Sequence, residues 1–541
     1  MKIRMLPLLA VLILSACGGG SSSGGGGLEP TTNTGSNSSA EDDTAGGGSE
    51  PNAVSDADTN DILSWQLGDF APSFNFKDYC AEPRAASSAS GDSYNDKAGS
   101  LQHEKMWLRS WSHESYLWYD EIDDVDPEPF VTAQAYFNVL KTRQRTASDA
   151  PKDNFHFYQD TAEYKKQTQS GVRTGYGLAL SWWQRGDVRE LVVSYVEPNS
   201  PAERALIDRG SVLLAVDGIR TDQLDNELLK QQFIAALSPE TEGESHSFLF
   251  RDLDPSVGER QLNMRSANVE TSPVLLSSYY DVGANKVAYL VFNRFIAPAQ
   301  PELISAFESM QQQGVSELIL DLRYNGGGLL YLAAQLAHMI SGRSESELFF
   351  EQQYNDKIES AGPIPFVSRE IDYGAGRFLD QRLPSLNLNR VFILTGAGTC
   401  SASEAVINGL RGVDIDVLLI GSQTCGKPYG FTAQDNCGTT YSTIQFQGVN
   451  AKGFGEYSTG FAATGSSNDA VKVSGCDVED DFSAVLGDNK EKRLQAALSL
   501  IGTGSCPSSA SAALNKSRGQ TSVLPFETDS LLNNGIFELI K

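Results

Sequence analysis

Basic residues are scarce in this chain of 541 residues, where 42 Lys and Arg stand against 69 Asp and Glu for a formal charge of −27. A nucleic-acid surface needs clustered Lys and Arg to displace counterions, so the charge balance argues against nucleic acid as a partner. The chain also lacks any apolar run near the ~18–20 residues that a membrane-spanning helix needs. Histidine is limited to five residues, and none lies in the glycine-rich loops discussed below. The length exceeds one domain of ~100–200 residues, and 40% hydrophobic residues suffice for a sizeable core.

The first 17 residues have the pattern of a secretory signal, with Lys2 and Arg4 before the apolar run 6–14. Residues 14–17 (LSAC) resemble a bacterial lipobox, in which Cys17 is lipidated and becomes the mature N-terminus. The alternative is an ordinary signal peptide with a coincidental cysteine. Residues 18–60 contain eleven glycines, seven acidic residues and no Lys or Arg, a composition typical of a disordered linker. We therefore expect a lipid-anchored protein of the bacterial cell envelope, and Gly18 after the cysteine favours the outer membrane, facing the periplasm.

Residues 61–170 are predicted to be mostly helical. One helical face is formed by apolar residues at helical spacing, namely Trp107, Leu108, Trp111, Trp118 and Ile122. A second helix is expected over residues 131–140. An aromatic stripe of this kind is more often core than a ligand site.

Residues 171–270 are predicted to form a small β-rich domain with strands at 191–196 and 211–216 and a helix at 225–237. The segments YGLAL, from Tyr176, and VEPNSPAERALIDRGSVLLAVDG resemble a PDZ domain. That resemblance implies that Tyr176, Gly177 and Leu178 form a loop that binds the carboxylate of a peptide C-terminus beside an exposed strand edge. Leu206 stands where this family usually has glycine. The alternative is an interdomain scaffold that binds no peptide.

Residues 271–505 alternate strands with helices. Strands are expected at 287–292, 318–322, 391–395 and 416–420, and helices at 301–313, 329–340 and up to residue 410. Repeated strand–loop–helix units predict an α/β domain with functional groups at the strand ends.

Three of these loops carry candidate chemistry. Gly327 and Gly328 lie in a glycine run where backbone N–H groups can approach a developing oxyanion. Ser401 precedes a helix and needs a base, and Lys427 can serve if burial keeps its amine neutral. Read from the residues alone, Ser401 is more often a helix N-cap and Lys427 a surface charge.

The ordered segments LILDLRYNGGG, TCSASEA and IGSQTCGK resemble the carboxyl-terminal processing, or tail-specific, serine proteases. The resemblance spans roughly residues 107–500 and implies a core of the crotonase and Clp-protease type with a Ser–Lys dyad. It makes Ser401 the nucleophile and Lys427 the general base, and it disfavours the rival nucleophile Ser403. Ala402, with one or two of the glycines, would supply the oxyanion N–H groups. Glu404 is interpreted as a residue that complements the helix dipole.

Two features depart from that family. Phe431 stands where a glutamine often orients the lysine, and Gln434 and Gln423 are only weak substitutes. Cys400 and Cys425 flank the dyad, and the six cysteines besides Cys17 suit up to three disulfides in an oxidising compartment. We expect a Cys400–Cys425 bridge and, with less support, Cys437–Cys476; the alternative is free buried thiols.

The sequence thus predicts a multidomain α/β protein: a helical N-terminal region, a PDZ-like β domain and an α/β protease core. The expected segments are a signal peptide (1–17), a linker (18–60), a helical domain (61–170), a PDZ-like domain (171–270), a protease core (271–505) and a tail (506–541). The expected activity is that of a serine endopeptidase without metal or cofactor, acting on proteins with free C-termini or unfolded tails. The alternatives are a non-catalytic envelope binding module and a hydrolase of another acyl substrate, such as peptidoglycan peptides.

Overall fold

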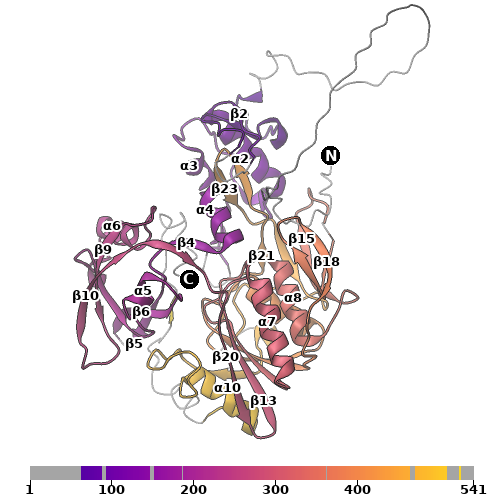
Figure 1. Ribbon diagram of the computed structural model, residues 1–541. Helices are drawn as coiled ribbons and strands as arrows, with labels where there is room; N and C mark the ends of the chain where they lie inside the picture. Colours follow the sequence, from indigo (N-terminus) through magenta and orange to yellow (C-terminus); the bar gives the residue numbers. More distant parts are fainter. Residues whose placement is uncertain are drawn as a thin grey trace, which may run out of the picture.

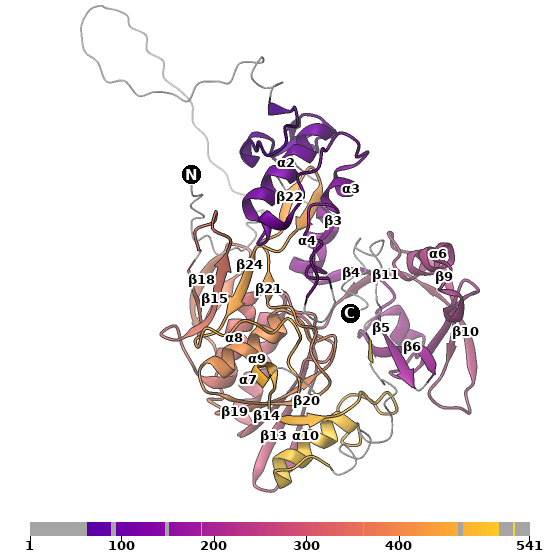
Figure 2. The same ribbon diagram turned by 180° about the vertical axis from the view of Figure 1, so that it is seen from behind.

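The computed structural model describes residues 62–507, except 88–92, 147–150, 186, 361 and 464–468, together with residues 523–524. Cys17, the linker 18–60 and most of the tail lie outside the described residues. Figures 1 and 2 show an N-terminal unit (62–170), a β-rich middle unit (172–270) and a larger α/β core (274–507). None of the helices formed by the described residues is long and apolar enough to cross a membrane.

The core is organised around a sheet with the strand order β12-β13-β14-β19-β20-β25. Its strands are β12 (Val274–Val282), β13 (Asn285–Phe292), β14 (Glu317–Asp321), β19 (Arg390–Thr395), β20 (Asp416–Gly421) and β25 (Gly475–Asp477). Only β12 runs antiparallel to its neighbour, and the other pairs are parallel. The near-continuous apolar sequence of β13 is typical of a parallel strand that is covered on both faces.

Helices cover both faces of this sheet. They are α7 (Ala299–Gln312), α8 (Leu330–Ser341), α9 (Ala402–Gly412) and α10 (Lys492–Thr503). Alternate residues of β13 enter different clusters: Leu290 packs with α7, α8 and α9, whereas Tyr289 packs with Leu494 of α10. The period of two along a strand therefore builds an α/β/α sandwich. The strands and helices predicted for the core are all present, within a few residues of the expected bounds.

Shorter elements surround the sandwich. They are β15 (Leu348–Tyr354), β16 (Ile364–Pro365), β17 (Arg369–Asp372), β18 (Arg377–Arg382), β21 (Tyr429–Gly430), β22 (Gln434–Asn436), β23 (Thr439–Ser442), β24 (Phe446–Val449) and η5 (Asp469–Val471). β16, β15, β24 and β21 form one sheet, and β17 pairs with β18.

The middle unit is an antiparallel sheet with the order β10-β9-β7-β6-β5-β26 and a helix, α6, packed against it. Its elements are β4 (Val172–Gly175), β5 (Leu178–Arg185), β6 (Val188–Val196), α5 (Pro201–Arg204), β7 (Val212–Val216), β8 (Ile219–Arg220), η4 (Thr221–Gln223), α6 (Glu227–Leu237), β9 (Ser245–Arg251), β10 (Glu259–Arg265) and β11 (Ala267–Glu270). The β4–β11 pair closes the unit. Leu206 has a φ of +55° and is exposed, which gives a physical reason for glycine at this position in similar sequences.

Part of the edge strand β5 has a strand partner on its outer side. β26 (Val523–Leu524), from the C-terminal tail, pairs antiparallel with Trp182 and Trp183 of β5. The opposite end of β5, next to Gly177, has no strand partner on that side among the described residues.

The N-terminal unit differs from the mostly helical prediction. Its elements are η1 (Ser73–Asn75), β1 (Tyr79–Cys80), β2 (Lys97–Ala98), α2 (Leu101–Ser115), η2 (Tyr119–Glu121), α3 (Ala133–Phe137), β3 (Phe157–Asp160), α4 (Thr161–Lys165) and a π-helix, η3 (Lys166–Ser170). The predicted aromatic face ends with α2 at Ser115, so Trp118 and Ile122 lie beyond the helix. The helix predicted over 131–140 is only the short α3. β3 joins β22 and β23 of the core in a three-stranded sheet, so the unit depends on residues far away in sequence.

Three disulfides join the cysteines of the described residues. Cys400 is bonded to Cys425, Cys80 to Cys437 and Cys476 to Cys506. The expected Cys437–Cys476 pairing is therefore wrong. Spacing along the chain could not identify these partners, because the Cys80–Cys437 bond joins residues 357 positions apart, in different units.

Candidate active site

The loops predicted to carry chemistry meet at one edge of the core sheet. β14, β19 and β20 are parallel neighbours, so the loops that follow them emerge at the same edge. A hollow at this edge is lined by residues of three loops and of the nearby short strands: Gly328, Leu330, Phe350, Ser401, Ala405, Lys427, Pro428, Tyr429, Gly430, Phe431, Phe446 and Tyr457. Ser401 and Lys427 therefore share one hollow. None of the five histidines, all within the described residues, lines it.

Ser401 occupies a strained turn between β19 and α9. Its φ is +56° and its ψ −113°, a backbone conformation rare for any residue with a Cβ. Such strain costs about 1–3 kcal/mol and persists where the surrounding structure enforces it, as at many active sites. The side chain is half-buried and reaches the hollow.

Ser403, the rival nucleophile, is committed elsewhere. It is 0% exposed, and its Oγ donates a hydrogen bond to the carbonyl oxygen of Asn325 at 2.9 Å. A hydroxyl that is buried and already bonded cannot meet a substrate carbonyl, so the geometry separates the two serines.

Glu404 holds the serine loop and the lysine loop together. Its Oε2 accepts hydrogen bonds from the N–H of Ser401 at 3.1 Å and from the N–H of Lys427 at 2.8 Å. Its Oε1 accepts from the Thr424 hydroxyl at 2.6 Å and from the N–H of Gly426 at 2.8 Å. The interpretation of Glu404 as a partner of the helix dipole is therefore incomplete, because its carboxylate also joins the Ser401 loop to the Lys427 loop.

Burial raises the pKa of Glu404 to about 6, against the opposing effect of the hydrogen bonds from Thr424, Lys427, Gly426 and Ser401. The folded protein therefore binds a proton at this carboxyl at a pH where the unfolded chain, with its ordinary value of 4.5, does not. Protonation of Glu404 consequently favours the folded state increasingly as the pH falls through about 6.

Glu404→Gln is expected to destabilise the fold by about 1–3 kcal/mol at neutral pH, because an amide NH₂ would face N–H donors in a buried site. The deficit relative to wild type is expected to widen as the pH falls from about 6 towards 4.5, because only the wild type gains from protonation there. Urea unfolding at several pH values measures both effects. Glu308→Gln, on the exposed face of α7, is the matched control. A deficit that stayed constant across this range would contradict the assignment.

The predicted oxyanion donors differ in what their N–H groups do. Gly327 N–H donates to Asn325 Oδ1 at 2.9 Å, so in this structure it is engaged within its own loop. The N–H groups of Gly328 and Ala402 donate to no atom of the described residues. The absence of a side chain at Gly327 lets this loop approach the Ser401 loop closely. A Cβ at this position would lie 2.8 Å from Ser401 Cβ and 2.9 Å from Ala402 N.

The lysine loop is fastened beside the serine loop. The Cys400–Cys425 bridge, with Cα atoms 5.2 Å apart, joins the residue before Ser401 to a residue two before Lys427. Lys427 is only 8% exposed. Neither of the glutamines weighed as its partner lines the hollow: Gln423 donates to the carbonyl oxygen of Thr459, and Gln434 lies in β22.

A metal role for this region has little support from the side chains. Cys400, Glu404 and Cys425 are close enough to share an ion. The two cysteine sulfurs are bonded to each other, so neither is a thiolate, the form of cysteine that binds metals.

The predicted peptide-binding residues lie beside a second hollow, in the middle unit. Tyr176, Gly177 and Leu178 line it, together with Arg173 and Arg294. Gly177 has a φ of +79°, and a Cβ there would meet Ser200 at 2.2 Å, so this turn requires glycine. Glu197 also lines the hollow, and burial raises its pKa to about 7 despite the nearby Arg294 and Arg173.

A buried charge cluster, which sequence reasoning missed, lies beneath the loop after β14. Asp480 accepts hydrogen bonds from Arg323 at 2.7 Å, from Arg209 of the middle unit at 2.7 Å and from the Tyr324 hydroxyl at 2.6 Å. Glu491 pairs with the same guanidinium of Arg323 at 2.7 Å. The cluster joins the middle unit to the loop that leads to Gly327 and Gly328.

Part of the chain is similar to known peptidases. Residues 286–439 match the model of Peptidase family S41. The chain is 26% identical over 335 residues to a carboxyl-terminal-processing protease of Picosynechococcus sp., covering 60% of this chain and 72% of that protein. It is 27% identical over 267 residues to the chloroplastic C-terminal processing peptidase of Tetradesmus obliquus, covering 48% of this chain and 52% of that protein.

A solved structure from Bacteroides fragilis, described as an S41 protease, superposes with a TM-score of 0.54 at 23% identity. The superposition covers 74% of this chain and 97% of that one, and at this identity it concerns the fold alone. The segment that matches the family model contains both Ser401 and Lys427. The chain is a homologue of the family S41 peptidases, and the enzyme class that these similarities support is that of a serine protease.

Proposed function

We propose that the protein is a serine endopeptidase in which Ser401 is the nucleophile and Lys427 the general base. The observation that carries the proposal is that these residues, from separate loops, line one hollow and donate their N–H groups to the same oxygen of Glu404. A lysine desolvated in such a hollow can act as a base, because burial disfavours the ammonium form.

The reaction follows from these positions. Lys427 Nζ takes the Ser401 hydroxyl proton as Oγ attacks the scissile carbonyl carbon. The N–H groups of Gly328 and Ala402 stabilise the tetrahedral oxyanion. The C–N bond then breaks, and Lys427 returns the proton to the leaving amine. Water, deprotonated by Lys427, hydrolyses the acyl-enzyme, and the same proton restores the Ser401 hydroxyl.

The substrates we propose are proteins of the cell envelope with free C-termini or unfolded tails. The loop at Tyr176, Gly177 and Leu178 would bind the terminal carboxylate through backbone N–H groups, with Arg173 as a nearby positive charge. Three disulfides suit an oxidising compartment. We extend the proposal to a lipid anchor at Cys17 on the outer membrane, facing the periplasm.

Cleavage of fluorescent casein, an unfolded substrate, tests the catalytic proposal. The full chain is expected to degrade it without ATP or added metal, and Ser401→Ala is expected to be inactive. Ser403→Ala is the matched control, and we expect it to retain activity if it folds. Equal degradation by wild type and Ser401→Ala would show that the activity is not that of Ser401. A wild type that binds casein without cleaving it would favour a non-catalytic binding module.

A further inference from the structure

Two aromatic rings enclose the amine of Lys427. The Nζ atom lies 4.8 Å from the ring centroid of Phe431 and 4.8 Å from that of Phe155. Phe431 belongs to the lysine loop, four residues after Lys427. Phe155 comes from the N-terminal unit, more than 270 residues earlier in the chain. The surroundings of the base are therefore formed by two units of the protein.

Hydrogen bonds made by the residues before and after Phe155 in the chain fix its position. Its own N–H donates to Asp153 Oδ1 at 2.8 Å, and the other oxygen of Asp153 accepts from the Tyr116 hydroxyl at 2.7 Å. The next residue, His156, is buried and bonds through its ring nitrogens to the Phe137 carbonyl oxygen at 2.8 Å and to the Thr443 hydroxyl at 3.0 Å. The backbone around Phe155 is thus determined by helices of the N-terminal unit and by the core together.

The N-terminal unit is itself fastened to the core beside this site. β3, which begins two residues after Phe155, pairs with β23. Phe157 packs edge-on against Phe431, with centroids 5.6 Å apart.

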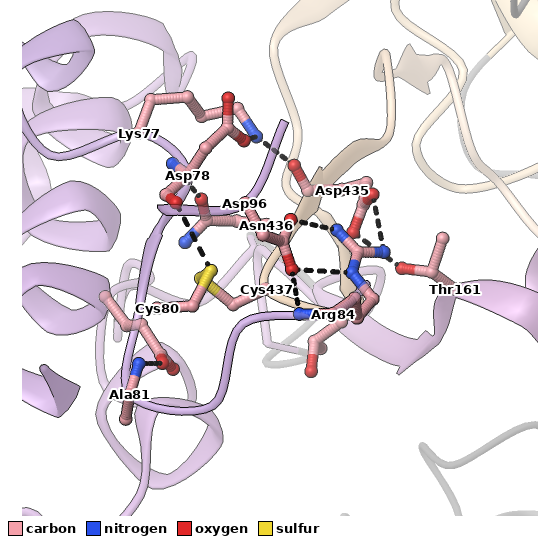
Figure 3. Close-up of a disulfide and its surroundings, with 12 residues drawn as sticks. Lys77, Asp78, Cys80, Ala81, Arg84, Asp96, Thr161, Asp435, Asn436 and Cys437 are labelled. Atoms are coloured by element: carbon pink, nitrogen blue, oxygen red, sulfur yellow. Dashed lines mark hydrogen bonds and ion pairs between the residues drawn. A yellow bond between two sulfur atoms is a disulfide. The ribbon is translucent and has the colours of Figure 1, made fainter. Parts of the chain in front are cut away.

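Further along the same sheet, Figure 3 shows the Cys80–Cys437 disulfide and the bonds around it. Asp78 N–H donates to Asn436 Oδ1 at 2.9 Å, and Arg84 and Thr161 both bond to Asp435. These contacts keep the N-terminal unit in register with the segment that carries Phe431.

A phenylalanine ring carries no carbonyl or carboxylate oxygen, so neither ring can accept a conventional hydrogen bond from the amine. Each ring can restrict where Nζ lies and keep water away from it. The ring faces also attract an ammonium group, but excluding water disfavours the charged form by more than a ring face restores. Among the residues that line the hollow, Tyr429 and Tyr457 are also ionisable, and the buried carboxylate of Glu404 accepts a hydrogen bond from the backbone N–H of Lys427.

We propose that Phe155 and Phe431 form an aromatic clamp that positions and desolvates the amine of Lys427, so that the N-terminal unit completes the base site of the protease. This inference rests on the proposed function, because it assigns Phe155 as a positioning residue for the base of that dyad. Two rings, one of which comes from another unit, thus lie against the amine of Lys427.

Phe155→Leu tests the clamp in the full chain, because leucine preserves an apolar side chain while removing the ring. Casein cleavage is expected to lose about tenfold in kcat with little change in KM, since the base is misplaced but substrate contacts remain. The acidic limb of the pH–rate profile is expected to move up by about one pH unit, because water entering the hollow favours the charged amine.

The double variant with both Phe155→Leu and Phe431→Leu is expected to lose less activity than the product of the two separate losses, because both rings act on one atom. Phe130→Leu, in the same unit but packed against Tyr136, is the matched control.

A second readout does not require proteolysis. Competitive acetylation of lysines across a pH range, followed by mass spectrometry, reports when the amine of Lys427 loses its proton, with the exposed Lys452 as internal reference. The midpoint for Lys427 is expected to rise in Phe155→Leu and to stay unchanged in Phe130→Leu. If casein cleavage requires Ser401 and Lys427 but Phe155→Leu behaves as Phe130→Leu in both measurements, the clamp is overturned and the protease proposal stands. If casein is not cleaved, the protease proposal fails, and the acetylation midpoint still decides whether the rings act on the amine.

Discussion

Lys427→Ala is expected to lower kcat/KM for casein by about 10³-fold or more, close to the loss in Ser401→Ala. An uncharged serine hydroxyl is a poor nucleophile, and no histidine lines the hollow to accept its proton. Because the two residues act as one unit, the double variant is expected to lose no more than the worse single variant. End-point assays of casein cleavage at high enzyme concentration measure the residual activity of the single and double variants.

The matched control for the lysine is Lys452→Ala. Lys452 is about half exposed and pairs with Asp414 at the surface, so its loss should change kcat/KM by less than about twofold. Near-wild-type activity in Lys427→Ala would place the base elsewhere. Additive losses in the double variant would mean that Ser401 and Lys427 do not act on the same proton.

Asp480→Asn is expected to cost about 3–5 kcal/mol of unfolding free energy, the range for removing one partner from a buried ion network. Asp480 is 3% exposed, and its carboxylate holds Arg209, Arg323 and Tyr324 together. The amide would leave the guanidinium groups of Arg209, Arg323 and Arg493 with less compensating charge in a buried environment. Because the cluster lies under the loop that leads to Gly328, activity is expected to fall as well.

Lowering the pH is expected to reduce the stability that the Asp480 cluster contributes to the fold. Burial alone would raise the pKa of Asp480, but the guanidinium groups of Arg493, Arg323 and Arg209 outweigh it and hold the pKa below its usual range. The stabilisation is therefore complete above the ordinary carboxyl value of 3.8 and is lost as the pH falls through the lower folded-state value.

Urea unfolding of Asp480→Asn and Asp414→Asn compares the same chemical change at a buried and an exposed ion pair. Asp414 has a side chain 82% exposed, so its replacement should change the free energy of unfolding far less than the replacement of Asp480. Equal costs for the two variants would contradict the assignment of the cluster as a buried network.

The core elements were predictable because their signals are local. β13, β14, β19 and β20 are short apolar runs that end in glycine-rich or small-residue loops, and the helices that follow them show helical periodicity. The adjacency of the Ser401 and Lys427 loops followed from a resemblance to known proteases and from the rule that parallel strand ends meet at one edge.

The roles that escaped prediction depend on partners far apart in sequence. From the sequence, Glu404 is a residue in the first turn of a helix. Three of its four hydrogen-bond donors lie in residues 424–427, in the loop after the next strand, and the sequence does not reveal that contact. The hydrogen bond from the Gly327 N–H to Asn325 Oδ1 is local, but it depends on the orientation of a side chain that the sequence does not specify. Phe155 carried no signal, because its importance arises only where β3 meets β23.

The sheet formed by β3, β22 and β23 also determines the order in which the protein can be assembled. Synthesis proceeds from the N-terminus, so residues 62–160 emerge long before their strand partners and before Cys437. A growing chain that has just passed Lys427 contains Ser401 and Lys427 but not yet the hairpin at 434–442 that brings Phe155 beside the lysine. The hairpin that completes the sheet with β3 is thus also the segment that brings Phe155 beside Lys427, so the surroundings of this amine form only after residues 434–442 have emerged.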